Sequence, residues 1–140
     1  MGSVLNPYLT FDGNAREAME FYRDALGGEL TLSTYGEMGD ESPNRDRIMH
    51  ASLRTGAGFT LMAADTAPGM EYTSGQNISI SISGEVEDAP EIHRYWDRLS
   101  AEAEVTMPLE RQVWGDEFGA CVDRYGISWM VDIATENSLP

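Results

Sequence analysis

The stretch Asn77-Ile78-Ser79-Ile80-Ser81-Ile82-Ser83 alternates polar and apolar residues without a break. Successive side chains of a β-strand point to opposite faces, so this alternation predicts a strand with one apolar and one polar face. We expect the isoleucines to pack on a helix, while Ser79 and Ser81 line a cavity on the opposite face. The strand opens the second half of the chain.

A helix is expected directly after this strand. Asp88 can cap its N-terminus, with Pro90 in the first turn and Glu91 at the capping-box position. The apolar stripe of this helix consists of Ile92, Trp96, Leu99 and Ala103. Three more strands are expected at Val105–Gln112, Phe118–Asp123 and Ser128–Ala134, with Trp129 facing Trp96. The order is therefore strand, helix and three strands.

The first half repeats this order. Val4–Phe11 is expected to be a strand, and Asn14 and Glu17 form a capping box for a helix that ends at Gly27-Gly28. The helix stripe consists of Ala15, Ala18, Met19, Tyr22 and Leu26, and the following strands are expected at Leu30–Ser33, Arg47–Arg54 and Phe59–Ala64. Turn-forming residues separate the halves at Pro68, Gly69, Ser74 and Gly75. These patterns predict an α+β protein with two βαβββ modules, about 1–70 and 75–140, within a single domain.

Charge and composition exclude several classes of partner. The chain has nine basic and 24 acidic residues, and its net charge of -15 would repel nucleic acids and anionic lipids. The chain contains no apolar run long enough for a membrane span and opens with no signal-peptide pattern, so we expect a cytoplasmic protein. Cys121 stands alone, which rules out an intramolecular disulfide, and is expected to be a buried packing residue.

Several short motifs carry a resemblance to a known family. They are Asn6–Phe11, Ala18–Tyr22 with Leu26-Gly27-Gly28, Tyr35–Met38, Met49-His50-Ala51, Trp114–Gly119 and Asp123–Met130. In this order the chain resembles the vicinal oxygen chelate superfamily of glyoxalases, bleomycin-resistance proteins and dioxygenases, most closely its PhnB-like branch. The resemblance implies cup-shaped mixed sheets with helices on the outer face, a ligand cavity on the concave face, and a homodimer.

Metal-dependent members of that superfamily hold a divalent ion with four His, Gln or Glu ligands inside the cup. The corresponding positions in this chain are Asn6 or Pro7, Leu61 or Met62, Asn77, and Met130. None of them offers a carboxylate or an imidazole, and a thioether is a poor ligand for Mg²⁺, Mn²⁺ or Zn²⁺. We therefore expect neither a metal nor another cofactor.

Residues inside the cup are the candidate ligand-binding residues. They are Tyr8, Thr10, Tyr35, His50, Met62, Ser79, Ser81, Trp114, Phe118 and Met130. Strand alternation places His50 on one face with Ser52 and Arg54, where it contacts the ligand or simply bonds to a backbone carbonyl or to Glu37. Asp132 adds a carboxylate at the rim or pairs with an arginine, and His93 is expected on the surface.

Two functions are consistent with this cup. The first is a metal-free protein that binds a small molecule in the manner of bleomycin-resistance proteins. The alternative is a lyase or isomerase that acts on a small carbonyl compound through His50 and Glu37, with or without a displaced divalent metal. Whether the chain is an enzyme stays open at this point. Methyl transfer is rejected, because the chain lacks a glycine-rich strand-to-helix turn for a nucleotide-shaped cofactor.

Overall fold

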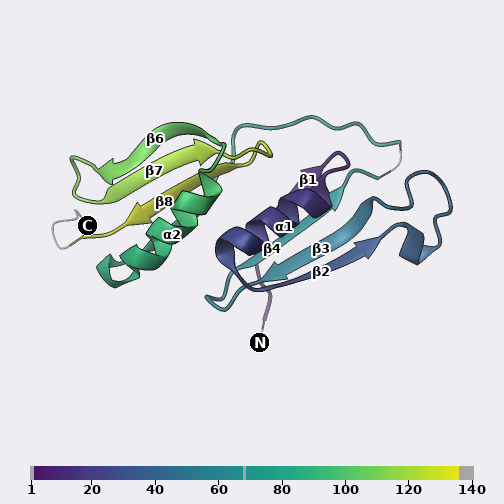
Figure 1. Ribbon diagram of the computed structural model, residues 1–140, viewed down its shortest axis with the longest axis horizontal. Coiled ribbons are helices and arrows are strands. Elements are labelled where there is room, and N and C mark those ends of the chain that lie inside the picture. Colours follow the sequence, from purple (N-terminus) through teal and green to yellow (C-terminus); the bar gives the residue numbers. More distant parts are fainter. Residues whose placement is uncertain (1, 68, 136–140) are drawn as a thin grey trace. The chain divides into compact units, whose positions relative to one another are not determined.

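The computed structural model describes residues 2–67 and 69–135 of the chain. It divides into two compact units, Met1–Thr73 and Ser74–Pro140, and each contains a four-stranded sheet and an α-helix (Figure 1). Pro68, one of the residues predicted to separate the halves, lies outside the described residues. None of the described helices is long and apolar enough to cross a membrane.

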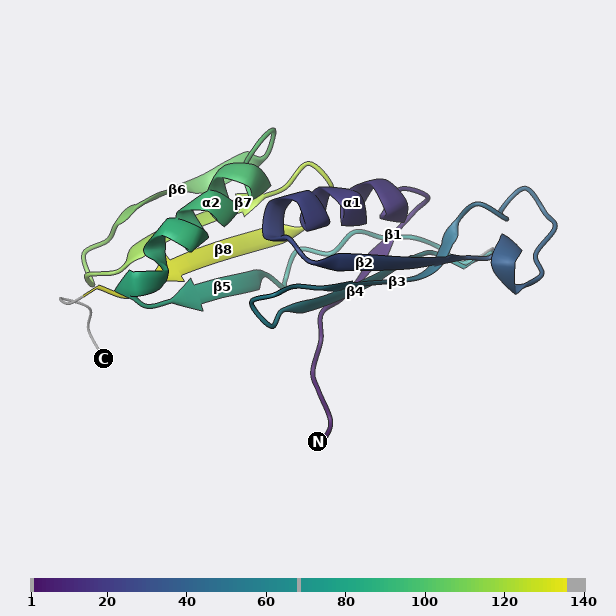
Figure 2. The same ribbon diagram turned by 60° about the horizontal axis from the view of Figure 1, so that its bottom comes forward.

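The first unit follows the predicted order of strand, helix and three strands. Its elements are β1 (Tyr8–Phe11), α1 (Ala15–Leu26), β2 (Glu29–Thr34), a 3₁₀ turn η1 (Gly36–Met38), β3 (Ile48–Arg54) and β4 (Thr60–Asp65). The sheet order is β1-β4-β3-β2, with β1 parallel to β4 and the other pairs antiparallel. Figures 1 and 2 show α1 across one face of this sheet, and every residue of its predicted stripe is buried.

The second unit repeats the same topology. Its elements are β5 (Ile80–Gly84), η2 (Val86–Asp88), α2 (Ala89–Leu99), β6 (Glu104–Arg111), β7 (Glu117–Val122) and β8 (Ser128–Ile133). The sheet order is β5-β8-β7-β6, and β5 runs parallel to β8. The predicted α+β fold with two βαβββ modules is therefore confirmed.

Two predicted strands begin later than their apolar patterns suggest. β1 starts at Tyr8, and the preceding Val4 and Leu5 are exposed. β5 starts at Ile80, so the prediction that Ile78 packs on the helix was wrong, and this side chain is 79% exposed. The ladder between β5 and β8 begins with the pair Ile80 and Trp129, and Ser79 contacts the first residue of β8 through its side chain, which bonds to the Ser128 hydroxyl.

The cap of α1 also differs from the prediction. Asn14 makes no side-chain capping bond, and the buried Asp65 at the end of β4 takes its place. Asp65 Oδ1 accepts hydrogen bonds from the backbone N–H groups of Gly13 (2.8 Å) and Ala15 (3.0 Å), while Oδ2 accepts from Ile48 N–H (2.8 Å). A carboxylate with three charge-assisted bonds satisfies the helix start better than a local amide.

The helix α2 begins at Ala89 after Asp88, with Pro90 in its first turn as predicted, but the capping box lies one turn earlier. The capping box forms between Glu85 and Asp88 around η2, with the Asp88 carboxylate accepting from Glu85 N–H at 2.9 Å. Glu91 therefore does not serve as the capping-box partner, and its carboxylate accepts a hydrogen bond from the Tyr95 hydroxyl at 2.5 Å. The helix ends at Leu99, so Ala103 lies beyond its apolar stripe.

The core of the second unit contains both buried tryptophans and the cysteine. Trp129 is fully buried and donates from Nε1 to Asp123 at 2.8 Å, while the Trp96 ring lies against Gly119, where an added Cβ would come within 3.0 Å of it. Cys121 is buried, as expected, and burial raises the pKa of its thiol to about 11.

Candidate functional site

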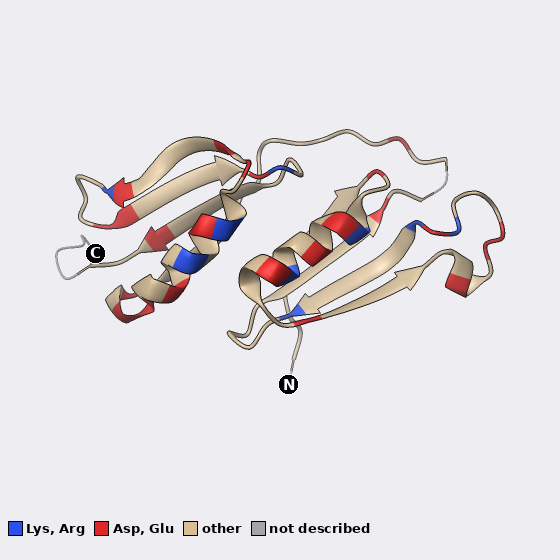
Figure 3. Cartoon of the chain, in the orientation of Figure 1, with Lys and Arg blue, Asp and Glu red and all other residues tan. Residues whose placement is uncertain are grey.

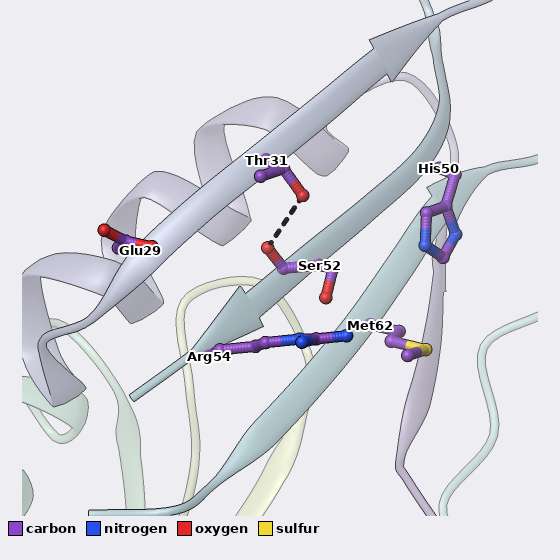
Figure 4. Close-up of a pocket in the computed structure, with 6 residues that line it drawn as sticks. All are labelled: Glu29, Thr31, His50, Ser52, Arg54 and Met62. Atoms are coloured by element: carbon purple, nitrogen blue, oxygen red, sulfur yellow. Dashed lines mark hydrogen bonds between the residues drawn. The ribbon is translucent and has the colours of Figure 1, made fainter. Parts of the chain in front are cut away.

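The face of the first sheet that α1 leaves uncovered contains a pocket of about 420 Å³. Along β3, Ala51 and Leu53 are buried on the helix side. His50, Ser52 and Arg54 alternate with them and point to the open face. Figure 4 shows the six lining residues, Glu29, Thr31, His50, Ser52, Arg54 and Met62. The pocket thus receives side chains from β2, β3 and β4.

Strand register explains why these residues meet. Across the antiparallel β2–β3 pair, Glu29 stands opposite Arg54, and Thr31 stands opposite Ser52. Across β3–β4, Ser52 also stands opposite Met62, which completes the pocket on its third side. Side chains on directly paired residues lie on the same face of a sheet. The Thr31 hydroxyl additionally donates to the Ser52 carbonyl at 3.4 Å, as drawn in Figure 4.

His50 and Tyr8 form a hydrogen-bonded pair at one side of the pocket. The Tyr8 hydroxyl lies 2.9 Å from His50 Nδ1, and the two ring centroids are 5.7 Å apart. Partial burial, and then the nearby Tyr35, raise the pKa of Tyr8, so its hydroxyl keeps its proton at neutral pH. The His50 ring is therefore held by a neutral phenol in place of the predicted carboxylate.

No hydrogen bond or ion pair joins Glu37 to His50 within residues 2–67 and 69–135, and their acid–base couple stays a prediction. Glu37 lies exposed in η1, where its carboxylate accepts a hydrogen bond from the Thr34 hydroxyl at 3.3 Å. The Thr34 hydroxyl in turn accepts from Glu37 N–H at 3.1 Å, so the residue is tied to its own turn. These two hydrogen bonds with Thr34 hold Glu37 at the end of β2, while the Tyr8 hydroxyl is the hydrogen-bond partner of His50 Nδ1.

The other candidates in the first unit fall into two groups. Met62 and His50 line the pocket. Tyr8 is not part of the lining, but its hydroxyl is hydrogen-bonded to the His50 ring. Thr10 is exposed on β1 and Tyr35 precedes η1, and neither belongs to the lining. Glu29 and Thr31 were missed as pocket residues, although their alternation with Leu30 and Leu32 could have placed them on the open face.

The open face of the second sheet contains most of the remaining candidates. Ser81 pairs with Met130 in register, while Phe118 packs against the Trp114 ring with centroids 6.0 Å apart. The side chain of Ser79, which precedes β5, bonds to the Ser128 hydroxyl at 2.8 Å. These positions are compatible with the predicted binding role, which remains a prediction.

A pair of carboxyls also lies on the second unit. Asp132 was expected at the rim of the cup or next to an arginine, and its close neighbour is Asp116. Burial, and then the neighbouring Asp116 carboxyl, raise the pKa of Asp132 to about 6. His93, the second histidine, lies partly exposed on α2, with Nε2 3.2 Å from the Glu117 carboxylate.

The donor set does not fit the divalent metal known from metal-dependent members of the superfamily. Asn6 or Pro7, Leu61 or Met62, Asn77 and Met130 provide amide, thioether and hydrocarbon groups only. Within residues 2–67 and 69–135, no three His, Cys, Asp or Glu side chains are placed to hold a metal ion. Hard divalent cations require oxygen or imidazole donors that converge on one point.

Comparison with known proteins identifies the family. Residues 3–132 match the family described as 3-demethylubiquinone-9 3-methyltransferase. The chain belongs to this family. One relative is protein YjdN of Escherichia coli (strain K12), which is 31% identical to this chain over 147 residues. The aligned region covers 94% of this chain and 96% of YjdN.

Solved structures agree with this family and its PhnB-like branch. Protein PA1353 from Pseudomonas aeruginosa is 35% identical, with a TM-score of 0.84 over 96% of this chain and 100% of its own. The PhnB protein from Bacillus cereus is 25% identical, with a TM-score of 0.74 over 94% of this chain and 100% of its own. A glyoxylase/bleomycin resistance protein/dioxygenase domain from Frankia sp. EAN1pec shares the fold, with a TM-score of 0.64 at 14% identity. The superposition covers 97% of this chain and 94% of that domain. The predicted PhnB-like family is therefore confirmed, and the chain shares the fold of the glyoxalase and bleomycin-resistance proteins.

Proposed function

We propose that the chain binds a small organic molecule, without a metal, in the pocket on the open face of the first sheet. The observation that carries this proposal is the pocket itself, about 420 Å³ in volume and lined by polar groups together with the Met62 side chain. Ligand sites of small molecules fall in the same range of size and combine apolar walls with a few placed polar groups. A thioether wall suits ligands of irregular shape.

Screening by thermal shift, followed by amide NMR, tests this proposal. A ligand that raises the melting temperature and shifts the backbone amides of His50, Ser52 and Met62 supports it. Thr31→Trp fills the pocket and should weaken that ligand about tenfold or more. Thr106→Trp, at an exposed strand position of the second unit, is the matched control and should leave the affinity unchanged. Ligands that shift only amides outside the pocket contradict the proposal.

The absence of a metal is tested on the same protein. Purification without chelator, followed by elemental analysis, should give far less than one equivalent of any transition metal, because the donors at the expected positions are weak. Stoichiometric, tightly held Mn, Zn, Fe or Ni would contradict the metal-free part of the proposal.

A second candidate function is acid–base chemistry on a small carbonyl compound. The hydrogen bond between Tyr8 and His50 favours it, because a histidine oriented by a neighbour can move a proton at its free nitrogen. Deuterium incorporation next to the carbonyl of 2-oxo acids and hydroxyketones would reveal such chemistry, and His50→Gln should abolish it. Exchange that persists in His50→Gln would exclude the histidine as the base.

Methyl transfer, which the family description mentions, is not the function we propose. The turn between β1 and α1 has the sequence Asp12-Gly13-Asn14, and β5 leads into η2 through Glu85. Neither turn has the glycine-rich pattern that lets a backbone approach a nucleotide-shaped cofactor.

We also propose that the chain acts in the cytoplasm as a homodimer. A buried free cysteine suits a reducing compartment, and the resemblance to the superfamily favours pairing. Sedimentation equilibrium should give about twice the mass of 15.5 kDa. A monomer at about 100 µM would contradict the dimer, since association that weak is rarely functional.

A further inference from the structure

We propose that this pocket binds an oxyanion of its ligand, a carboxylate or phosphate group, through Arg54 together with His50 and Ser52. The inference rests on the proposed function and adds the chemical class of the ligand. Three separate observations on the lining residues support it: an arginine without an acidic partner, a buried hydroxyl without a hydrogen bond, and a histidine held by a tyrosine.

Arg54 is the first observation. The chain has 24 acidic residues against nine basic ones, and Figure 3 shows the positions of the acidic residues, in red, spread over both helices and many turns. Some of the other arginines pair with carboxylates, namely Arg23, Arg47 and Arg124; Arg47, for example, lies 3.1 Å from the Asp12 carboxylate. Across the described residues, the Arg54 guanidinium forms neither an ion pair nor a hydrogen bond, although Glu29 stands opposite it in register. Its planar donors are therefore available to a ligand carboxylate or phosphate.

The Ser52 hydroxyl is the second observation. It lies between His50 and Arg54 on the same strand face, and its Oγ is buried without a hydrogen-bond partner among residues 2–67 and 69–135. Buried polar side-chain atoms nearly always have a partner, and an exception in a pocket indicates that a ligand or water supplies it. A ligand oxygen next to Arg54 would accept from this hydroxyl as well.

His50 is the third observation. When the Tyr8 hydroxyl donates to Nδ1, the neutral imidazole carries its proton on Nε2. His50 then adds an N–H donor to the guanidinium and the hydroxyl. Such a set of donors prefers an acceptor with several oxygens and a negative charge.

Glu29 places a limit on this arrangement. Its carboxylate also lines the pocket, next to Arg54 in register, and would repel an anion at that side. The oxyanion should therefore lie on the Ser52 and His50 side of the guanidinium, with the remainder of the ligand against Met62. Glu29→Gln removes the repulsion and should tighten anion binding by about threefold.

Matched aromatic probes test the inference by amide NMR. Benzoate and phenyl phosphate carry an oxyanion, whereas benzamide has the same ring and no charge. We expect one of the two anions to shift the amides of His50, Ser52 and Arg54, and the anion that binds more tightly identifies carboxylate or phosphate as the preferred group. Arg54→Met should weaken that anion about tenfold or more. Arg16→Met, an equal charge change on the exposed side of α1, should not.

The outcomes separate this inference from the proposed function. Equal binding of benzoate and benzamide in the pocket, unaffected by Arg54→Met, would overturn the oxyanion inference and leave small-molecule binding intact. The same holds if neither anion shifts the pocket amides up to about 10 mM while a neutral ligand from the screen does. If no molecule of any class shifts these amides, both proposals fail together. Arg54→Lys provides a second measurement, because it retains the charge and loses the planar fork, and its affinity should fall between those of the parent chain and Arg54→Met.

Discussion

Asp65 offers the most demanding test of how the first unit is held together. Its buried carboxylate accepts three backbone N–H groups, from Gly13, Ala15 and Ile48, and so joins the end of β4 to the start of α1 and to β3. Asp65→Ala removes all three bonds. The donors of Ala15 and Ile48 are buried, while that of Gly13 is partly reached by water.

The expected loss follows from these contacts. A buried donor left without a partner costs about 1–3 kcal/mol, so two such donors and one partly solvated donor give a loss of about 3–5 kcal/mol. Small domains have total stabilities of about 5–15 kcal/mol, so the change would be a large share of the free energy of unfolding. Asp65→Asn keeps one acceptor oxygen but presents an amide N–H to a backbone N–H, and should lose roughly half as much.

Urea unfolding with two optical probes measures this loss. Far-UV circular dichroism reports on both units, whereas tryptophan fluorescence reports on the second unit, which contains Trp96, Trp114 and Trp129. Asp65→Ala should lower the unfolding midpoint in the dichroism signal. Asp46→Asn, an exposed aspartate of the same unit, is the control. A loss below about 0.5 kcal/mol for Asp65→Ala, equal to that of the control, would refute the reasoning, because surface substitutions produce changes of that size.

Three further predictions concern the second unit. Asp123→Ala should lower the free energy of unfolding by about 2–4 kcal/mol, because Asp123 accepts hydrogen bonds from two backbone N–H groups of the next turn and from the Trp129 indole. Urea unfolding followed by tryptophan fluorescence measures this loss, and an unchanged midpoint would argue against it. Burial, and then Asp116, raise the pKa of Asp132 to about 6, so the folded chain holds this proton more tightly than the unfolded chain. The stability that this proton contributes is fully present below about pH 4 and is lost as the pH rises through about 6. Asp132→Asn should therefore be more stable than the parent by about 1 kcal/mol at pH 7.5, after allowance for solvent screening, and about equally stable at pH 4. The opposite pH trend in thermal melts would exclude this account. Cys121 is buried with its pKa raised to about 11, so a thiol reagent should react at least about a hundredfold more slowly with the folded chain than in urea, and rapid labelling of the folded chain would contradict its burial.

Part of the candidate site could be predicted from local sequence. Alternation along β3 placed His50 on one face with Ser52 and Arg54, and the structure has these residues together in the pocket. The same rule, applied to β2, would have included Glu29 and Thr31. The partner of His50 could not be predicted in this way. Tyr8 lies 42 residues away and reaches the ring only because β1 is parallel to β4, which pairs with β3.

The sequence by itself determined the elements and their buried faces, since the period of apolar residues depends on neighbours a few positions apart. The stripe from Ala15 to Leu26 is one case: each residue it predicted to be buried is buried. Tertiary structure alone decided where strands begin, which carboxylate caps α1 and which group bonds to His50. Each of these depends on a partner brought close by strand pairing, and the competition among Asn14, Asp65 and other polar groups for one N–H is resolved only when the chain has folded.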